Sequence, residues 1–436
     1  MFRDTWQCRS SHVTRRMMSR VNNHIMEIFR LLVIPAFLTF LLSQSLSAQV
    51  KTGVDVLQEN KFNILEGKRV GLLTNPTGVD RNLKSTIDIL FEAPNVKLTT
   101  LFAPEHGVRG DEYAGANVEN SKDEKTGLPV YSLHGKIKKP TPEMLANVDV
   151  VVYDIQDIGC RSYTFISSLG LLMEAAAENK KEVVVLDRPN PLGGYKVEGA
   201  LVESGFYSFV SQYSIPYIYG LTCGELATYL NENKLIKAKC SLTVVRMEGW
   251  KRGMTFDKTG LKWVLTSPHI PQSATACYYP LSGIVGELNA LSVGVGYTLP
   301  FELFGAEWIH SDSLAKRMNA LQLPGILFRP VTYKPFYSIG SGKLLHGVQV
   351  YITDFEKAAL SEVQFYLMQE LHKLYPGKNP FLLGSLQNYR MFDNVCGTDK
   401  IRIQFSKRFM FEDIRELWRK NAETFRKSSE RYWMYE

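Results

Sequence analysis

The sequence predicts an α/β protein in which a doubly wound parallel sheet is followed by a smaller α/β unit. Hydrophobic residues make up 45% of the 436 residues and charged residues 22%, a composition typical of globular proteins with a packed core. Between residues 68 and 194, short runs of Val, Leu and Ile alternate with helical segments. This alternation is the pattern of parallel strands that helices cover on both faces.

The elements of the first half follow in order along the chain. Strands are expected at 68–75, 96–107, 149–159 and 182–194, and helices at 83–93, 141–148 and 163–181. The helix expected at 163–181 is long and apolar. The short helix expected at 141–148 begins with Thr141 as its cap, followed by Pro142 in its first turn. Ligands of such a sheet bind beyond the carboxyl ends of the strands.

The second half has a different composition. A helix is expected over 222–236 and a strand over 241–250, while residues 270–309, rich in Gly, Pro and aromatic residues, predict a long loop. Segments 311–322, 347–354 and 360–375 predict a smaller α/β unit, and 409–433 a terminal helix. We find no internal repeat.

Residues 1–48 are predicted to be a signal peptide, because an apolar stretch is followed by small residues that end near Ala48. A compact signal begins at Met26, which suggests that residue as the true start. The alternative is a single membrane anchor, since the apolar stretch is near the short limit for spanning a bilayer. The mature chain is expected in the periplasm or outside the cell, with no stable membrane span.

Charge and cysteine content exclude two classes of protein. The formal charge of +7 includes a surplus of four positive charges within residues 1–48, so the mature chain is only weakly basic and predicts no nucleic-acid partner. Five cysteines remain after cleavage, an odd number without a CxxC pair, which predicts neither a disulfide framework nor a zinc site. The sequence does not indicate an oligomeric state.

Polar side chains stand at the end of each predicted strand of the first half. They are Asn75 after the first strand, Glu105 and His106 after the second, Asp154, Gln156 and Asp157 at the third, and Asp187, Arg188 and Asn190 at the fourth. Residues two apart in a strand point to the same side, so Asp154 and Gln156 can face one cleft. Turn chemistry alone also favours Asp, Asn and Gly at such places. Four polar strand ends in succession favour an active site.

Known cofactor and nucleophile motifs are missing. No GxGxxG follows the first strand and no GxSxG is present, which disfavours a dinucleotide site and a nucleophile elbow. The segment 338–343 lacks the first glycine of a phosphate loop, because Tyr337 stands there. No cofactor and no metal are therefore expected. A metal held by His106, His134 or His269 with nearby carboxylates remains an alternative.

The strand-end groups suit a sugar substrate. Glycosidic cleavage needs a carboxylic acid that protonates the leaving oxygen and a second group at the anomeric centre. Glu105 lies near apolar residues and is the expected acid. Asp154 or Asp157 is expected to stabilise the developing oxocarbenium ion, or to orient water or an acetamido group.

Two arginines near the strand ends have two interpretations. Arg161 and Arg188 can receive a carboxylate of the substrate by bidentate pairing. Alternatively, they pair with Asp157 or Asp187 inside the protein. The sequence does not decide between the two.

Four long segments of the first half resemble a known family. They cover 67–90, 101–135, 149–175 and 185–194, and include the motifs PEHG, DIQDIGCR and DRPNP. These segments resemble the DUF1343 family, whose characterised members are exo-β-N-acetylmuramidases, and the resemblance covers nearly all of the mature chain. It implies a Rossmann-like domain over 49–235 and a smaller C-terminal domain over 236–436, with the active-site cleft between them. It also implies release of N-acetylmuramic acid from the non-reducing ends of peptidoglycan fragments.

The resemblance carries functional residues over motif by motif. Glu105 and His106 stand in the first motif, Asp154, Gln156, Asp157 and Arg161 in the second with Tyr163 just after it, and Asp187, Arg188 and Asn190 in the third. We therefore expect Glu105, His106, Asp154 and Asp157 to be catalytic, and the others, with Asn75, to bind substrate.

Two segments depart from the family pattern. Ile218 and Tyr219 stand where the family usually has Arg and His, and Val293 and Val295 stand where it has Glu and Arg. Glu287 is retained nearby and is expected to contribute to substrate binding. The departures keep two alternatives open: a non-catalytic muropeptide-binding protein, or a glycosidase for another acidic or N-acetylated sugar.

Overall fold

The computed structural model describes residues 49–110, 120–383 and 386–436. The predicted signal peptide and the proposed start at Met26 lie outside the described residues. Within the described ranges, no helix has the length and apolar character needed to cross a membrane. The five cysteines of these ranges are free thiols.

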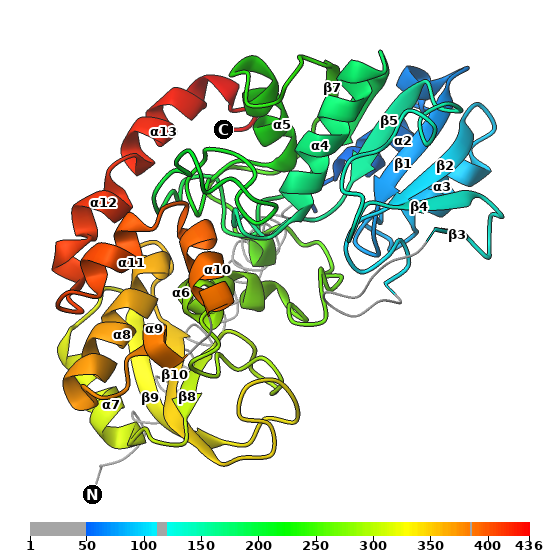
Figure 1. The fold of residues 1–436 in the computed structure, drawn as a ribbon. Coiled ribbons are helices and arrows are strands. Elements are labelled where there is room, and N and C mark those ends of the chain that lie inside the picture. Colours follow the sequence, from blue (N-terminus) through cyan, green and yellow to red (C-terminus); the bar gives the residue numbers. More distant parts are fainter. Residues whose placement is uncertain (1–48, 111–119, 384–385) are drawn as a thin grey trace, which may run out of the picture. The chain divides into compact units, whose positions relative to one another are not determined.

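A seven-stranded sheet with the order β3-β4-β2-β1-β5-β6-β7 dominates the first part of the chain (Figure 1). Its strands are β1 (Arg69–Thr74), β2 (Lys97–Ala103), β3 (Ser121–Lys122), β4 (Pro129–Ser132), β5 (Val150–Asp154), β6 (Glu182–Leu186) and β7 (Ser241–Val245). All neighbours pair in parallel except β3 with β4. The predicted parallel sheet is confirmed.

Helices cover both faces of this sheet, as expected for a doubly wound fold. Helices α2 (Gly53–Glu59) and α3 (Thr86–Glu92) lie on one face, and α4 (Phe165–Glu178) and α5 (Cys223–Glu232) on the other. In β5, Val150 and Val152 belong to the core beneath α2 and α3, whereas Val151 and Tyr153 belong to the core beneath α4 and α5. Alternate side chains thus fill two cores, which is why the central strands β5 and β6 are almost continuously apolar.

A smaller antiparallel sheet with the order β8-β10-β9 forms the second part. Its strands are β8 (Leu303–Ala306), β9 (Ile326–Tyr333) and β10 (Leu345–Ile352). Helix α7 (Ser311–Ala320) contacts β9 and β10 and also packs against α8 (Val363–Leu374), as Figure 1 shows. Helices α9 (Pro380–Leu383), α10 (Leu386–Cys396) and α11 (Lys400–Phe405) follow. The predicted smaller α/β unit is confirmed.

Three local predictions were wrong. Residues 270–309 contain α6 (Ser273–Gly286), which buries Leu281 and Ile284 and accommodates Pro280 in its interior, so burial outweighs a loop-like composition. The terminal helix is broken into α12 (Arg415–Arg419) and α13 (Ala422–Ser429). Residues 142–147 form turns rather than a helix.

The division of the chain at residue 235 stays a prediction. Strand β7 follows that position but pairs with β6 along its whole length, so the large sheet takes its last strand from beyond the proposed boundary. Within residues 49–436 the two parts are also joined by hydrogen bonds. Ser211 Oγ, from the first half, donates to the backbone carbonyl of Asn394 in α10 at 2.6 Å.

Candidate active site

The carboxyl ends of β1, β2, β5 and β6 meet at one edge of the large sheet. Asn75 follows β1, Glu105 follows β2, Asp154 ends β5 and Asp187 follows β6. The chain leaves β1 toward β2 and leaves β5 toward β6, so the strand order reverses between β1 and β5. Such a switch point is where open parallel sheets bind their ligands. The structure therefore brings the predicted residues to the expected edge.

Asp154 and Arg188 form a buried ion pair at the centre of this edge. Arg188 Nε lies 2.5 Å from Asp154 Oδ1 and its Nη2 lies 2.8 Å from Oδ2. Thr86, in the first turn of α3, also donates to Asp154 Oδ2, at 2.5 Å. Asp154 is fully buried. The partner of Arg188 is thus Asp154 rather than Asp187, and the paired carboxylate holds the guanidinium in one orientation.

Asp187 is enclosed by donors from distant parts of the chain. Its carboxylate accepts hydrogen bonds from Thr222 Oγ1 at 2.7 Å, the Gly224 backbone N–H at 2.8 Å and the Tyr435 hydroxyl at 2.6 Å. Burial raises its pKa, and these donors oppose the shift. Asp187 therefore fastens the start of α5 and the C-terminal residues to the end of β6. No sequence motif predicted Tyr435 as a partner.

Amide side chains order the loops beside this pair. Asn75 Oδ1 accepts from the Thr77 backbone and hydroxyl, and its Nδ2 is buried with no hydrogen-bond partner among the described residues. Gln156 Nε2 donates to the backbone carbonyl of Pro189 at 2.7 Å. Asn190 Nδ2 donates to a backbone carbonyl ahead of α5 at 2.9 Å. Asn75 thus orders the loop after β1, Gln156 ties the loop after β5 to the loop after β6, and Asn190 ties the latter to the segment before α5.

Asp157 is a second buried carboxylate at this edge. Its Oδ2 accepts from the Tyr219 hydroxyl and, at 2.7 Å, from the Gly159 backbone N–H. Its Oδ1 is buried with no hydrogen-bond partner among the described residues. Burial raises the pKa of Asp157 to about 6, against the opposing effect of the two donors. The group can therefore exchange a proton near neutral pH.

Glu105 and His106 occupy the turn after β2. Glu105 is half-buried, and Thr164 Oγ1, just before α4, lies 3.3 Å from its Oε2. His106 has a φ of 76° and is followed by Gly107 at 77°. A left-handed conformation is uncommon for a residue with a side chain and is often found at functional sites. The turn that carries Glu105 thus has an unusual backbone conformation at its second residue.

Tyr163 links these carboxylates to the second half of the chain. Its hydroxyl donates to Thr266 Oγ1 at 2.8 Å, and its ring packs edge-on against Phe165 and Tyr279 at 5.0 and 5.8 Å. Burial raises the pKa of Tyr163, and the charge of Glu105 adds to that shift. The predicted residue Tyr163 therefore stands between the sheet edge and α6.

His269 comes from the same loop as Thr266 and approaches His106. Burial lowers the pKa of His269, and the neighbouring His106 lowers it further. Its Nε2 lies 3.1 Å from the Tyr337 hydroxyl. His269 thus lies near His106, and its burial favours the neutral imidazole. Among the residues that the structure describes, no group of three or more His, Cys, Asp or Glu side chains is arranged to hold a metal ion.

Arg161 lies inside the protein rather than at the sheet edge. Its guanidinium donates to the backbone carbonyls of Ala200 and Val395, both at 2.7 Å, to that of Ile215, and to Ser211 Oγ at 3.2 Å. Its side chain is almost fully buried, and burial lowers its pKa to about 10. The expected function of Arg161 in receiving a substrate carboxylate is thereby corrected, since the guanidinium instead joins the two parts of the chain.

Glu287 follows α6 directly. It lies four residues after Gly283, which faces Tyr217 and Tyr279. A Cβ atom placed on Gly283 would lie 3.0 Å from the Tyr217 hydroxyl and 3.5 Å from the Tyr279 ring. Residues four apart share a helix face, so Glu287 is directed toward the same tyrosines. Burial raises its pKa to about 7. The carboxyl is therefore partly protonated at neutral pH.

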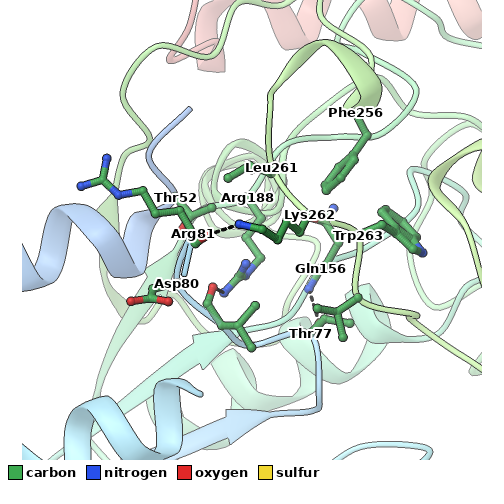
Figure 2. A pocket seen from close by; sticks show the side chains of 12 residues that line it. Thr52, Thr77, Asp80, Arg81, Gln156, Arg188, Phe256, Leu261, Lys262 and Trp263 are labelled. Carbon is green, nitrogen blue, oxygen red and sulfur yellow. Dashed lines mark hydrogen bonds between the residues drawn. The ribbon is translucent and has the colours of Figure 1, made fainter. Parts of the chain in front are cut away.

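A small pocket opens beside Arg188, and Figure 2 shows the side chains around it. The first half of the chain supplies Thr77, Gln156 and Arg188, and the segment after β7 supplies Phe256, Lys262 and Trp263, together with Thr52, Val79, Asp80, Arg81, Leu261 and Val264. The aromatic rings of Phe256 and Trp263 are 4.8 Å apart, edge to face. Cationic and aromatic groups thus surround one space at the switch point. We call it the Arg188 pocket.

Comparison with known families decides the classification. The family model for the N-terminal part of exo-β-N-acetylmuramidase NamZ matches residues 70–274, and the model for its C-terminal part matches residues 277–435. This chain belongs to the NamZ family. It is 46% identical over 388 residues to the peptidoglycan β-N-acetylmuramidase NamZ of Bacillus subtilis (strain 168), covering 89% of this chain and 92% of that protein.

Two solved structures from Bacteroides fragilis NCTC 9343, both of DUF1343 family proteins, share the fold. The first is 57% identical with a TM-score of 0.87, and it covers 89% of this chain and 99% of its own. The second is 25% identical with a TM-score of 0.70 and the same coverage. The resemblance noted in the sequence is thus confirmed for both halves of the chain.

The departures from the family pattern have structural consequences. The Tyr219 hydroxyl donates a hydrogen bond to Asp157, so a donor stands where the resemblance led us to expect a His. Ile218 is fully buried and pairs with Glu198 through its backbone. Val293 is also buried, and Val295 packs against the same core. Apolar side chains therefore pack on the α6 side of the site.

Sequence reasoning missed several side chains of this NamZ family site. They are Thr77, Thr86, Thr164, Tyr219, Thr266 and Tyr279, all hydroxyl donors or acceptors. Hydroxyl residues are too common in loops to be singled out by pattern, and apart from the Thr77–Asn75 bond these partners lie tens of residues away. In the sequence, only the PEHG and DIQDIGCR motifs indicated where the site residues that these hydroxyl groups contact would lie.

Proposed function

We propose that this chain is an exo-acting β-N-acetylmuramidase, a glycoside hydrolase that releases N-acetylmuramic acid from the non-reducing ends of peptidoglycan fragments. Membership of the NamZ family over both halves supports the activity. The structural observation that carries it is a half-buried carboxylate, Glu105, at the same sheet edge as a guanidinium that a buried carboxylate holds in place.

Glu105 is the proposed proton donor to the leaving oxygen. Asp154 and Asp187 are fully enclosed by protein donors, whereas Glu105 is half-buried and therefore reaches the surface of the site. His269 lies close to His106, and its burial favours the neutral imidazole, which can accept a proton. Asp157, which titrates near pH 6, is the proposed second group, acting on water or on the acetamido group of the sugar.

The Arg188 pocket is the proposed site for the lactyl carboxylate of the sugar. Arg188 Nε and Nη2 bind Asp154 and a backbone carbonyl, and among the described residues Nη1 has no hydrogen bond. Lys262 lies in the same pocket and adds a second positive charge (Figure 2). A carboxylate placed there would receive a charge-assisted hydrogen bond. The saccharide is thus bound by its acidic arm.

The location of the protein is proposed to be the periplasm or the cell exterior. The apolar stretch and small residues before Ala48 support a cleaved signal peptide. N-terminal sequencing of the protein recovered from its native compartment tests this proposal. A mature chain beginning near residue 49 supports it, and an intact segment 26–48 in the cytoplasm contradicts it.

Hydrolysis of a chromogenic N-acetylmuramic acid β-glycoside tests the activity. We expect turnover by the mature chain and a loss of at least 100-fold in kcat for Glu105→Gln, as for removal of a general acid. The matched control is Glu66→Gln, at an exposed position outside the site. Equal loss in both variants contradicts the assignment of Glu105.

A non-catalytic muropeptide-binding protein is the second candidate, favoured by the apolar packing of Val293 and Val295 where the family has charged residues. Its signature is a shift of the melting temperature by N-acetylmuramic acid without any turnover of the glycoside. Turnover by the mature chain excludes it.

A further inference from the structure

A cavity of about 1020 Å³ lies outside the site described above. None of the predicted site residues lines it. Its walls come from residues 191–196, residues 252–258 after β7, the first turns of α6, and residues 352–356 at the end of β10. This volume is at the upper end of the range of ligand sites in proteins. The cavity is therefore large enough for several sugar rings.

Aromatic side chains line this cavity on more than one side. Tyr195 is 55% exposed, although its ring packs edge-on against Trp433. Phe355 lies on the opposite segment, with the Lys196 ammonium 4.8 Å from its ring centre. Tyr278, in α6, is half-buried. An aromatic face left open to solvent can be covered by the apolar C–H face of a sugar ring.

The polar groups of the cavity suit a polyhydroxyl ligand. Asp257, Lys258 and Asp354 bring charges of both signs, and Thr255 donates to Asp257 Oδ1 at 2.5 Å. Carboxylates accept hydrogen bonds from sugar hydroxyls, and the ammonium and hydroxyl groups donate to them. A purely anionic ligand would be repelled by the aspartates, and a purely cationic ligand by the lysine. Saccharide is the ligand chemistry that fits.

The cavity is adjacent to the Arg188 pocket, because the Phe256 side chain lines both. Figure 2 shows the Phe256 ring directed into the pocket beside Trp263. We propose that the cavity binds the sugar units of the peptidoglycan strand that follow the residue released at the active site. This inference rests on the proposed function and deepens it, since the cavity would favour long strands over short fragments.

Gly253 offers a way to fill the cavity without disturbing the backbone. It lines the cavity, its φ is not positive, and a Cβ built on it meets only a Tyr195 ring carbon, at 3.7 Å. Gly253→Trp therefore places an indole in the space. Gly377→Trp is the matched control, because Gly377 is exposed and nothing lies within 4 Å of its added Cβ. Tyr195→Ala is a second variant at an exposed side chain.

The test compares kcat/KM for a muramic-acid-terminated tetrasaccharide with kcat/KM for the chromogenic monosaccharide glycoside. We expect the ratio of the two to fall at least 10-fold in Gly253→Trp and at least 3-fold in Tyr195→Ala, and to be kept in Gly377→Trp. Circular dichroism confirms that each variant is folded. An unchanged ratio in both cavity variants overturns the inference.

A failure of the proposed function gives a different result. If the unaltered chain hydrolyses neither substrate, calorimetry with a tetrasaccharide of N-acetylglucosamine measures binding alone. Binding that is lost in Gly253→Trp and kept in Gly377→Trp then supports the cavity as a saccharide site. Equal binding by both variants, or none by the unaltered chain, overturns it.

Discussion

Replacement of Asp157 by Asn separates the function of this carboxyl from its effect on stability. Asp157 Oδ2 accepts two hydrogen bonds, from Tyr219 and Gly159, while its buried Oδ1 has no partner among the described residues. An Asn side chain can keep its oxygen at the Oδ2 position and place its NH₂ at the Oδ1 position. Asp157→Asn therefore resembles the protonated acid in shape and charge.

The magnitude follows from the pKa. Burial raises the pKa of Asp157 from its ordinary 3.8 to about 6. A shift of about two units corresponds to about 3 kcal/mol between the two protonation states. The buried carboxyl is tolerated in its protonated form, which the folded protein keeps up to about pH 6, whereas the unfolded chain already loses this proton near pH 4. The stability of the fold is therefore fully present below about pH 4 and falls as the pH rises through about 6. The Asn variant has no such loss, so it gains on the unaltered chain by up to about 3 kcal/mol above pH 6.

Urea denaturation at several pH values between 4 and 8 measures this difference. We expect the gap in unfolding free energy between Asp157→Asn and the unaltered chain to widen from pH 4 to 6 and then to level off. Hydrolysis of the glycoside by the same variant should fall, since a proton-exchanging group is gone. A gap that does not change with pH refutes the reasoning, because it would mean that Asp157 is not a buried acid.

Three further substitutions test other parts of the account. Tyr219→Phe removes a donor to the same carboxylate, so stability should fall by about 1–3 kcal/mol at pH 8 and less at pH 4, as chemical denaturation would show. Arg188→Lys loses the bidentate pair with Asp154; we expect a loss of about 1–3 kcal/mol, and an unchanged urea midpoint would argue against the pair. Arg252→Met leaves the fully buried Glu225 without its partner, at a cost of about 3–5 kcal/mol. Burial already raises the pKa of Glu225 to about 7, so this cost should be greater at pH 8 than at pH 5.

The large sheet and the edge that carries the site were predictable from the sequence. Strands buried on both faces must be apolar throughout, and the first polar residues after them mark their carboxyl ends. Asn75, Glu105, Asp154 and Asp187 were found in this way, and the parallel pairing places them at one edge. The topology of the sheet is therefore sufficient to predict that these four residues lie close together.

The partners of these residues were not predictable. Arg188 has aspartates at 154, 157 and 187 nearby in sequence or across strands, and only the tertiary structure selects Asp154. Arg161 stands in the DIQDIGCR motif yet donates to backbone carbonyls in the interior. Tyr435 reaches Asp187 across 248 positions of the chain. Long-range hydrogen bonds have no local pattern, so the sequence alone does not show them.

The most direct test of the account is product analysis with a defined glycan. A tetrasaccharide with N-acetylmuramic acid at its non-reducing end is incubated with the mature chain and with Glu105→Gln, and early products are separated by mass spectrometry. We expect free N-acetylmuramic acid as the first product of the unaltered chain and none above background from Glu105→Gln. Release of larger fragments first, or equal release by both proteins, would contradict it.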